Sequence, residues 1–298
     1  MSQFTAINLA QVAPPDVIEP LDFEQILSAM LADLLERAPE LDAQVESEPF
    51  MKLLEVCAYR ELQLRARIND AARAVMLPYS TGTDLDNLGA LFGVGRLLLS
   101  PAVQTAIPPI AAVYESDSDF RYRIQLSLEG LSTAGPEGAY IFHALSADGQ
   151  VLDASAISPT PGQVLITVLS RAGTGVPSAA LLATVLAKLS DESVRPLTDY
   201  VQVQAATIAQ YQVTATLYFY AGPDREVVMA NARAALEAYT AGQHRLGLDV
   251  TLSGIYAALH QPGVQRVDLT SPTANLVVNR QSASYCTAIN LTDGGLDE

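Results

Sequence analysis

Apolar residues recur at three- and four-residue spacing near the start of the chain, a pattern typical of an amphipathic helix. The apolar stripe comprises Phe23, Ile26, Leu27, Met30, Leu31, Leu34 and Leu35. Asp22 precedes the stripe as a candidate N-cap, and Pro39 follows it as a stop signal. The pattern therefore predicts a first helix between these two residues.

A second, longer helix is predicted from Pro49 to Leu77. Its apolar positions alternate four and three residues apart, which is a heptad pattern with one charged member. The heptad positions are Phe50, Leu54, Cys57, Glu61, Leu64, Ile68, Ala71 and Val75. A helix of this length spans roughly 40 Å and needs other helices to cover its apolar row. Those helices can belong to this chain or to a partner chain. We favour a partner, because only the first helix and a short third one are near in sequence.

The stretch from Ile68 to Arg96 indicates a joint between two helices. Pro78 and Gly82 are expected to end the long helix, and Thr83 or Asp84 to cap the next one. Asp86 is placed for a capping-box contact. The third helix is expected to bury one apolar face, formed by Leu85, Leu88, Leu91 and Phe92. A nucleophile with a neighbouring base does not occur in this stretch.

The pattern changes after a Pro-rich connector. A helix with Phe120, Ile124 and Leu128 on one face precedes a short apolar helix that carries Tyr140 and Ile141. Strands and helices then alternate, and the clearest strand places alternating residues on one face: Tyr211, Val213, Ala215, Leu217 and Phe219. The expected fold class is α+β, with an N-terminal long-helix bundle segment followed by two small α+β modules. The expected division is 1–95 (helical), 96–134 (connector and helix), 135–200 (first module) and 201–298 (second module).

A weak internal repeat links the two modules. The segments "YIFHALSADGQVLDASAISPTPGQVLI" and "GIYAALHQPGVQRVDLTSPTANLVV" share a short helix, a Gly turn, a strand with Asp, a Ser-Pro pair and a second strand. The match requires a one-residue shift, so it suggests related modules and no more.

Charge and composition narrow the class of protein. Residues 1–50 contain ten acids and one base, a balance of −9 within a net charge of −16. Such an N-terminus disfavours nucleic-acid binding. It is either a solvated acidic face or a helix that packs beside the Arg-bearing one. A membrane-length apolar run and a signal peptide are not expected, and two distant cysteines favour a reducing, cytoplasmic place of folding.

Candidate chemistry is sparse. The three histidines, His143, His244 and His260, lack metal-ligand spacing, so packing or capping is the preferred interpretation. "AGTGVPS" lacks the ending of a phosphate-binding loop and indicates a tight turn. Most paired carboxylates lie at helix starts, where acids are favoured as caps. Asp191 and Glu192 lie near a helix end and are expected to be solvated. We therefore expect no catalytic residues, metal or cofactor.

Three motifs resemble a known family. "EPFMKLLEVCAYRELQLRARINDAARAVMLPYSTGTDLDNLGALFGVGR" is similar to the signature of the baseplate assembly protein J family of contractile-tailed bacteriophages. "ESDSDFRYRIQLSLEGLSTAGPEGAYIFHAL" and "RPLTDYVQVQAATIAQYQVTATLYFYAGPD" continue the resemblance in order. The first motif is specific, whereas each of the others is weak on its own.

The resemblance implies a non-enzymatic structural role in a baseplate wedge. A second copy of the chain and a smaller wedge protein would join it through an N-terminal helical bundle. Neighbouring wedges, the central hub and the sheath-initiating protein would be further partners. Assembly would take place in the bacterial cytoplasm, for a phage or a phage-tail-like bacteriocin. The bundle interface would contain Phe50, Leu54, Cys57, Leu64, Ile68 and Val75. Glu61 would pair with a basic group or lie at the bundle's edge.

Two alternatives come from other classes. A cell-wall hydrolase of the same particle would need two carboxylates across a cleft. A receptor-binding module would be expected to be richer in strands and in aromatic residues than a chain with 6% aromatic content.

Overall fold

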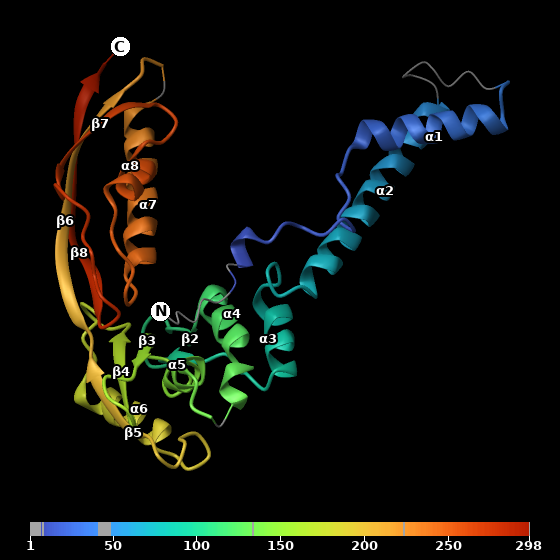
Figure 1. The fold of residues 1–298 in the computed structure, drawn as a ribbon. Helices are drawn as coiled ribbons and strands as arrows, with labels where there is room; N and C mark the ends of the chain where they lie inside the picture. The colour runs from blue at the N-terminus through green and yellow to red at the C-terminus, as the bar shows by residue number, and fades with distance from the viewer. Residues whose placement is uncertain (1–6, 8, 41–48, 133, 223, 298) are drawn as a thin grey trace. The chain divides into compact units, whose positions relative to one another are not determined.

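The computed structural model describes residues 7, 9–40, 49–132, 134–222 and 224–297, and the chain divides into two compact units (Figure 1). The helical unit comprises Thr5–Arg96 and Asp117–Arg121. The sheet unit comprises Leu97–Ser116 and Tyr122–Glu298. Helices come first and mixed helices and strands follow, so the predicted α+β class is confirmed.

The helical unit contains η1 (Leu9–Gln11), α1 (Phe23–Arg37), α2 (Pro49–Ala74) and α3 (Gly82–Leu91). Asp22 caps α1 as predicted, since its carboxylate accepts a hydrogen bond from the Gln25 amide at 3.1 Å. The α2 helix has 26 residues, which corresponds to about 39 Å.

The predictions for α3 were wrong in two respects. The helix begins at Gly82 with Thr81 as its N-cap, so neither Thr83 nor Asp84 caps it, and Asp86 pairs with Arg96 instead. Leu85 is fully buried, whereas Leu91 and Phe92 are exposed. The apolar face is therefore narrower than the sequence suggests, because only the side of Leu85 and Gly89 meets the rest of the unit.

The connector is a short antiparallel hairpin. Its strands are β1 (Leu98–Ser100) and β2 (Val113–Tyr114), followed by α4 (Asp117–Leu126) and η2 (Glu129–Leu131). Phe120 and Ile124 are buried as predicted, but Leu128 is exposed because α4 ends before it.

The first module comprises α5 (Glu137–Leu145), β3 (Val151–Ile157), β4 (Gln163–Ser170), α6 (Ala179–Leu189) and β5 (Tyr200–Ala205). Its sheet order is β3-β4-β5, with β3 antiparallel and β5 parallel to the central strand. Ser178 caps α6 through the Leu181 amide at 3.2 Å. Apolar residues of α5, α6 and the sheet form one core, which includes Tyr140, Ala144, Ile166, Val168 and Val185.

The second module comprises β6 (Thr207–Phe219), α7 (Arg225–Gln243), α8 (Leu252–Leu259), β7 (Val264–Ser271) and β8 (Ser282–Leu296). Its sheet order is β7-β6-β8, and α7 and α8 lie along one face of the sheet (Figure 1). Val213, Ala215, Leu217 and Phe219 of β6 point into the core beneath these helices. The predicted alternation of β6 is therefore confirmed.

The two modules have the same kind of sheet but not the same order of elements. In each sheet the central strand has one antiparallel and one parallel neighbour. The repeat holds for α5–β3 and α8–β7, and then fails. Residues 274–278 form no strand and contribute one isolated bridge, between Leu276 and Val250, while β7 pairs with β6. The predicted second strand of the repeat was wrong, because β6 already occupies that position.

One nearly continuous strand joins the modules. Only Ala206 separates β5 from β6, and its amide donates to the Val168 carbonyl at 3.0 Å. A small apolar cluster surrounds this point: Leu152, Leu169, Ala206, Ile208, Leu246 and Ala283. The Leu246 amide also donates to the Asp153 carboxylate at 2.9 Å, and Ser155 Oγ donates to the Arg280 carbonyl at 2.5 Å. The modules are therefore packed together as parts of one unit.

Candidate assembly interface

The α1 helix covers one side of α2. Ile26 and Leu27 of α1 are buried against Ala58 of α2, where the small alanine side chain lets the two helices approach closely. Phe23, Met30, Met51, Leu54 and Leu62 pack around these three residues. The acidic first helix thus packs beside the Arg-bearing second helix of the same chain. Among the described residues the contact is apolar, since the ion pairs of α2 run within α2 or to Glu19.

Most of the predicted interface residues lie on a different side of α2. Phe50, Leu64, Ile68 and Val75 are between 47% and 69% exposed, and Cys57 is also exposed. Leu54 is the exception, because it is partly buried against α1. The α2 helix ends at Ala74 and not at the predicted Leu77, so Val75 lies just beyond the helix. At 3.6 residues per turn, positions 50, 57, 64 and 68 of the helix follow one row, and Val75 continues the row in sequence. We call this row the α2 seam. It lies roughly a quarter-turn around the helix from Ala58.

Charged side chains border the seam. Glu61 accepts a hydrogen bond from Arg65 Nε at 2.9 Å, so the acidic member of the heptad pairs with a basic group as expected. Arg65 also lies 3.2 Å from the Glu19 carboxylate. Neither charge is buried without a partner, and the seam is bordered by neutralised groups.

The segment before α1 is fastened to α2 by Asn69, which the sequence reasoning missed. The Asn69 side chain is buried, donates to the Glu19 carbonyl at 2.8 Å and accepts from the Glu19 amide at 3.2 Å. Tyr79 holds the same segment further along, donating to the Val12 carbonyl at 2.6 Å. An asparagine amid helical apolar spacing was the available signal, because its amide can pair with a neighbouring backbone.

Charged side chains from distant positions build the joint between α2 and α3. Arg96 pairs with Asp86 at 2.7 Å and with Asp117 at 2.8 Å, and it lies over the Phe120 ring. Arg121 donates to the Leu77 and Ser80 carbonyls at 2.7 and 2.8 Å, at the end of α2. The stretch is a joint, as predicted, and the first turn of α4 fixes it.

The histidine and the carboxylate that were weighed as catalytic candidates, His143 and Asp191, make hydrogen bonds within the fold. His143 Nε2 lies 3.1 Å from the Gly130 carbonyl, and burial lowers the pKa of its imidazole. Asp191 and Glu192 are exposed, as expected, and the Asp191 carboxylate also accepts from the Ser193 amide and hydroxyl at 2.8 and 2.6 Å. These hydrogen bonds lower the pKa of Asp191. A group of three or more metal-ligating side chains does not occur in the described part of the chain.

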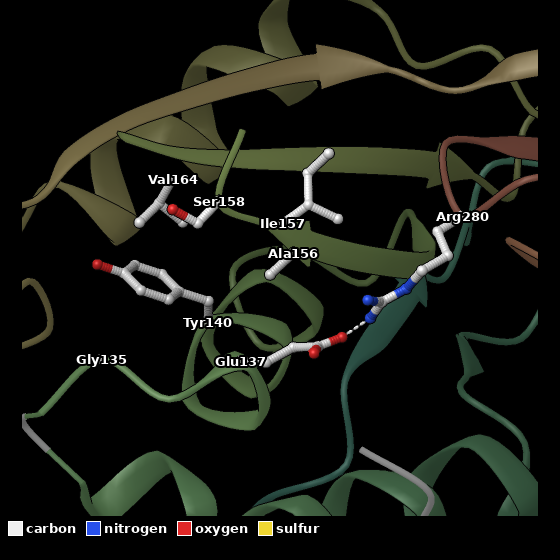
Figure 2. A pocket seen from close by; sticks show the side chains of 8 residues that line it. All are labelled: Gly135, Glu137, Tyr140, Ala156, Ile157, Ser158, Val164 and Arg280. Carbon is white, nitrogen blue, oxygen red and sulfur yellow. Dashed lines mark ion pairs between the residues drawn. The ribbon is translucent and has the colours of Figure 1, made fainter. Parts of the chain in front are cut away.

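A cavity of about 260 Å³ lies in the sheet unit (Figure 2). Glu137 and Arg280 form an ion pair on one side of it, and Tyr140 lies on the other. Tyr140 donates to the Asp199 carboxylate at 2.7 Å, and Ser158 donates to the Thr160 carbonyl at 3.1 Å. Burial and the Asp199 carboxylate raise the pKa of the Tyr140 hydroxyl. The polar groups around the cavity are thus engaged with their own chain and form no nucleophile–base pair.

Comparisons with known proteins agree across the chain. Three domain families match in order: the Baseplate J-like N-terminal domain at residues 46–103, the central domain at 132–205 and the C-terminal domain at 211–292. The chain belongs to the Baseplate J-like family. The Baseplate J-like chain is also 52% identical to "Baseplate protein J" of Escherichia phage P2 over 98% of its own length and 99% of that protein.

Among solved structures, the Baseplate J-like chain matches one chain of the baseplate of the anti-feeding prophage, determined by cryo-EM with 6-fold symmetry. The TM-score is 0.39 at 14% identity, and the match covers 61% of this chain and 43% of the other. Family membership places the protein among baseplate components of contractile tails. The helices of its described residues are too short or too polar to cross a membrane.

Proposed function

We propose that this protein is a structural wedge subunit that uses the α2 seam to form a helical bundle with a second copy and with a smaller wedge protein. The observation that carries the proposal is the row of exposed apolar side chains at heptad spacing: Phe50, Cys57, Leu64, Ile68 and Val75. Exposed apolar rows of this length mark protein interfaces. Heptad spacing specifies that the partner surface is another helix.

The energetics favour more than one partner helix. Full burial of a Leu, Ile, Val or Phe side chain contributes about 1.5–3 kcal/mol, and these are already half covered, so each adds on the order of 1 kcal/mol. Each seam then contributes on the order of 5 kcal/mol, so two seams contribute about 10 kcal/mol, whereas association costs about 4–15 kcal/mol. Two seams alone bind weakly, and a third helix from a smaller protein would add the missing apolar contact.

The helical part, the connector and the two modules are proposed to have separate roles in assembly. Residues 1–95 enter the bundle, and residues 96–134 connect it to the two modules. The modules divide at Ala206 and not between residues 200 and 201, because β5 belongs to the first sheet. The modules would contact neighbouring wedges, the central hub and the sheath-initiating protein. Assembly would occur in the bacterial cytoplasm, before the baseplate becomes part of a particle. Each module has its own apolar core, which supports its use as a rigid building block.

A structural role without catalysis agrees with the engagement of the candidate acids. Asp86 and Asp117 hold Arg96, and Asp191 closes a turn with Ser193. A hydrolase would need two such groups free to face a substrate. We find no specific observation in favour of the hydrolase or of the receptor-binding alternative.

The test is the native mass of the complex after co-expression with the small wedge protein encoded beside this one. Leu64→Asp with Ile68→Asp should abolish the complex, because it places two charges in the bundle core. Tyr59→Asp is the matched control, since Tyr59 is 53% exposed on the opposite side of α2. If the double variant still forms the complex, the α2 seam is not the interface.

A further inference from the structure

The connector forms an exposed hairpin without charge, which we call the uncharged hairpin (Leu97–Tyr114). No charged residue lies between Arg96 and Glu115, although the chain has a net charge of −16. Ile107 is fully exposed, and about half of the surface of Val103, Ile110 and Tyr114 is exposed. The remaining polar side chains between residues 101 and 113 are Gln104 and Thr105. Such a surface is typical of a protein contact and not of a solvated loop.

The base of the uncharged hairpin is firmly held. Glu115 and Arg123 form a buried ion pair beneath it, and Glu115 also accepts a hydrogen bond from the Leu97 amide at 3.0 Å. Gln150 donates to the Leu99 carbonyl at 2.7 Å. Glu115, the charge that follows the hairpin, is thus buried in its base together with Arg123, and the apolar part extends from this base.

The hairpin is an incomplete sheet. Within the described part of the chain, β1 and β2 pair only with each other. The ladder continues through Val103 and Ile110, which exchange hydrogen bonds of 2.9 and 3.1 Å. Two-stranded hairpins are marginal in water, and three or more strands with an apolar face are needed for stability. The edge of β1 is already covered, because Gln150 donates to the Leu99 carbonyl and Gly149 lies against the Leu98 carbonyl. The edge of β2 is therefore the one that offers backbone groups to an added strand.

We propose that the uncharged hairpin pairs with the uncharged hairpin of a second copy of this chain. Two identical β2 edges are self-complementary in a two-fold arrangement, and the two hairpins together give a four-stranded sheet. Two chains with a charge of −16 repel each other over most of their surface, but the hairpin brings no carboxylate to the contact.

The proposed function, on which this step rests, supplies the second copy. A contact through the α2 seam makes hairpin pairing effectively intramolecular, so a small interface is sufficient. The hairpin is then a second point of contact between the two copies of a wedge.

The test is sedimentation equilibrium of the full-length chain. Ile107→Asp with Ile110→Asp should weaken self-association at least about tenfold, since like charges would meet across the pair. Leu197→Asp is the matched control, because Leu197 is 95% exposed in another loop, and it should leave self-association unchanged. Both variants change exposed side chains, so circular dichroism should show the same folded spectrum.

Equal dissociation constants for the hairpin variant and the Leu197 control overturn the proposal. A wild-type chain that is monomeric at every accessible concentration also overturns it, and would leave another baseplate protein as the occupant. Failure of the proposed function is seen separately, as a wedge complex that survives Leu64→Asp with Ile68→Asp.

Discussion

The carboxylate of Asp117 accepts a hydrogen bond from the amide of Gly82 at 3.2 Å, across 35 positions of sequence. Gly82 is the first residue of α3, so its amide has no partner within the helix. Asp117 thereby takes the part of an N-cap from the first turn of another helix. It also holds Arg96, which reaches back to Asp86 in α3.

Replacing Asp117 with Asn should lower the free energy of unfolding by about 1 kcal/mol at neutral pH. Burial alone would raise the pKa of Asp117, but the hydrogen bonds from Arg96 and Gly82 outweigh it, and the pKa lies below the ordinary 3.8. The stabilisation is therefore complete above that ordinary value and is lost as the pH falls through the lowered pKa of the folded state. Urea unfolding at several pH values measures it. Asp84→Asn, in the first turn of α3, is the control. If the wild-type chain and Asp117→Asn still differ in stability at pH 2, the ionised Asp117 carboxylate is not the source of the stabilisation.

Replacing Arg123 with Met should lower the free energy of unfolding by about 3–5 kcal/mol, because the Glu115 carboxylate is left buried without its cation. The Glu115 and Arg123 side chains are 1% and 6% exposed. Glu115→Gln in the same chain should recover part of the loss. The control is Arg225→Met, which breaks the exposed pair with Asp293 and should cost less than about 1 kcal/mol. If Arg123→Met and Arg225→Met lower the free energy of unfolding equally in a urea titration, the buried ion pair contributes no more than the exposed one.

Replacing Ala58 with Leu should separate α1 from α2. Ala58 is fully buried where the two helices touch, so three additional carbons have no space, and we expect a loss of about 1–3 kcal/mol. Hydrogen exchange should show faster exchange in α1 and α2 than in the sheet unit. Ala32→Leu makes the same change at an exposed position of α1. Unchanged exchange in α1 after the Ala58 substitution would be inconsistent with this packing.

Cys57 allows the α2 seam to be probed without new residues. It is exposed on the seam, whereas Cys286 is partly buried in the second module. If two copies meet along the seam, a short bismaleimide should join them through Cys57. The linked dimer should persist in Cys286→Ala, and be lost in Cys57→Ala and in Leu64→Asp with Ile68→Asp. A linked dimer that depends on Cys286 would place the contact elsewhere.

Local patterns predicted the elements whose signals are contained in their own residues. The alternation along β6 and the cap of α1 by Asp22 are examples, because period and capping act within a few positions. The heptad row was also readable. Its exposure was not, because the period alone does not say which side α1 covers.

The errors arose where distant residues decide the local structure. Thr83 and Asp84 were good local caps for α3, but Asp117 and Arg96 stabilise an earlier start. Residues 274–278 have strand propensity, but they form no strand beside β7 because β6 pairs with β7 there. The two hydrogen bonds between Asn69 and Glu19 also join segments 50 positions apart, so the sequence showed the polar residue on the helix but not its partner.

The near-continuity of β5 and β6 has a mechanical consequence. A load applied to the two sheets in opposite directions would run along this strand, at right angles to much of the hydrogen bonding that holds it. Bonds loaded in this direction share the force and must shear together, whereas a peeled strand loses them one by one. The two sheets would therefore transmit a pulling force through Ala206 and extend little under load.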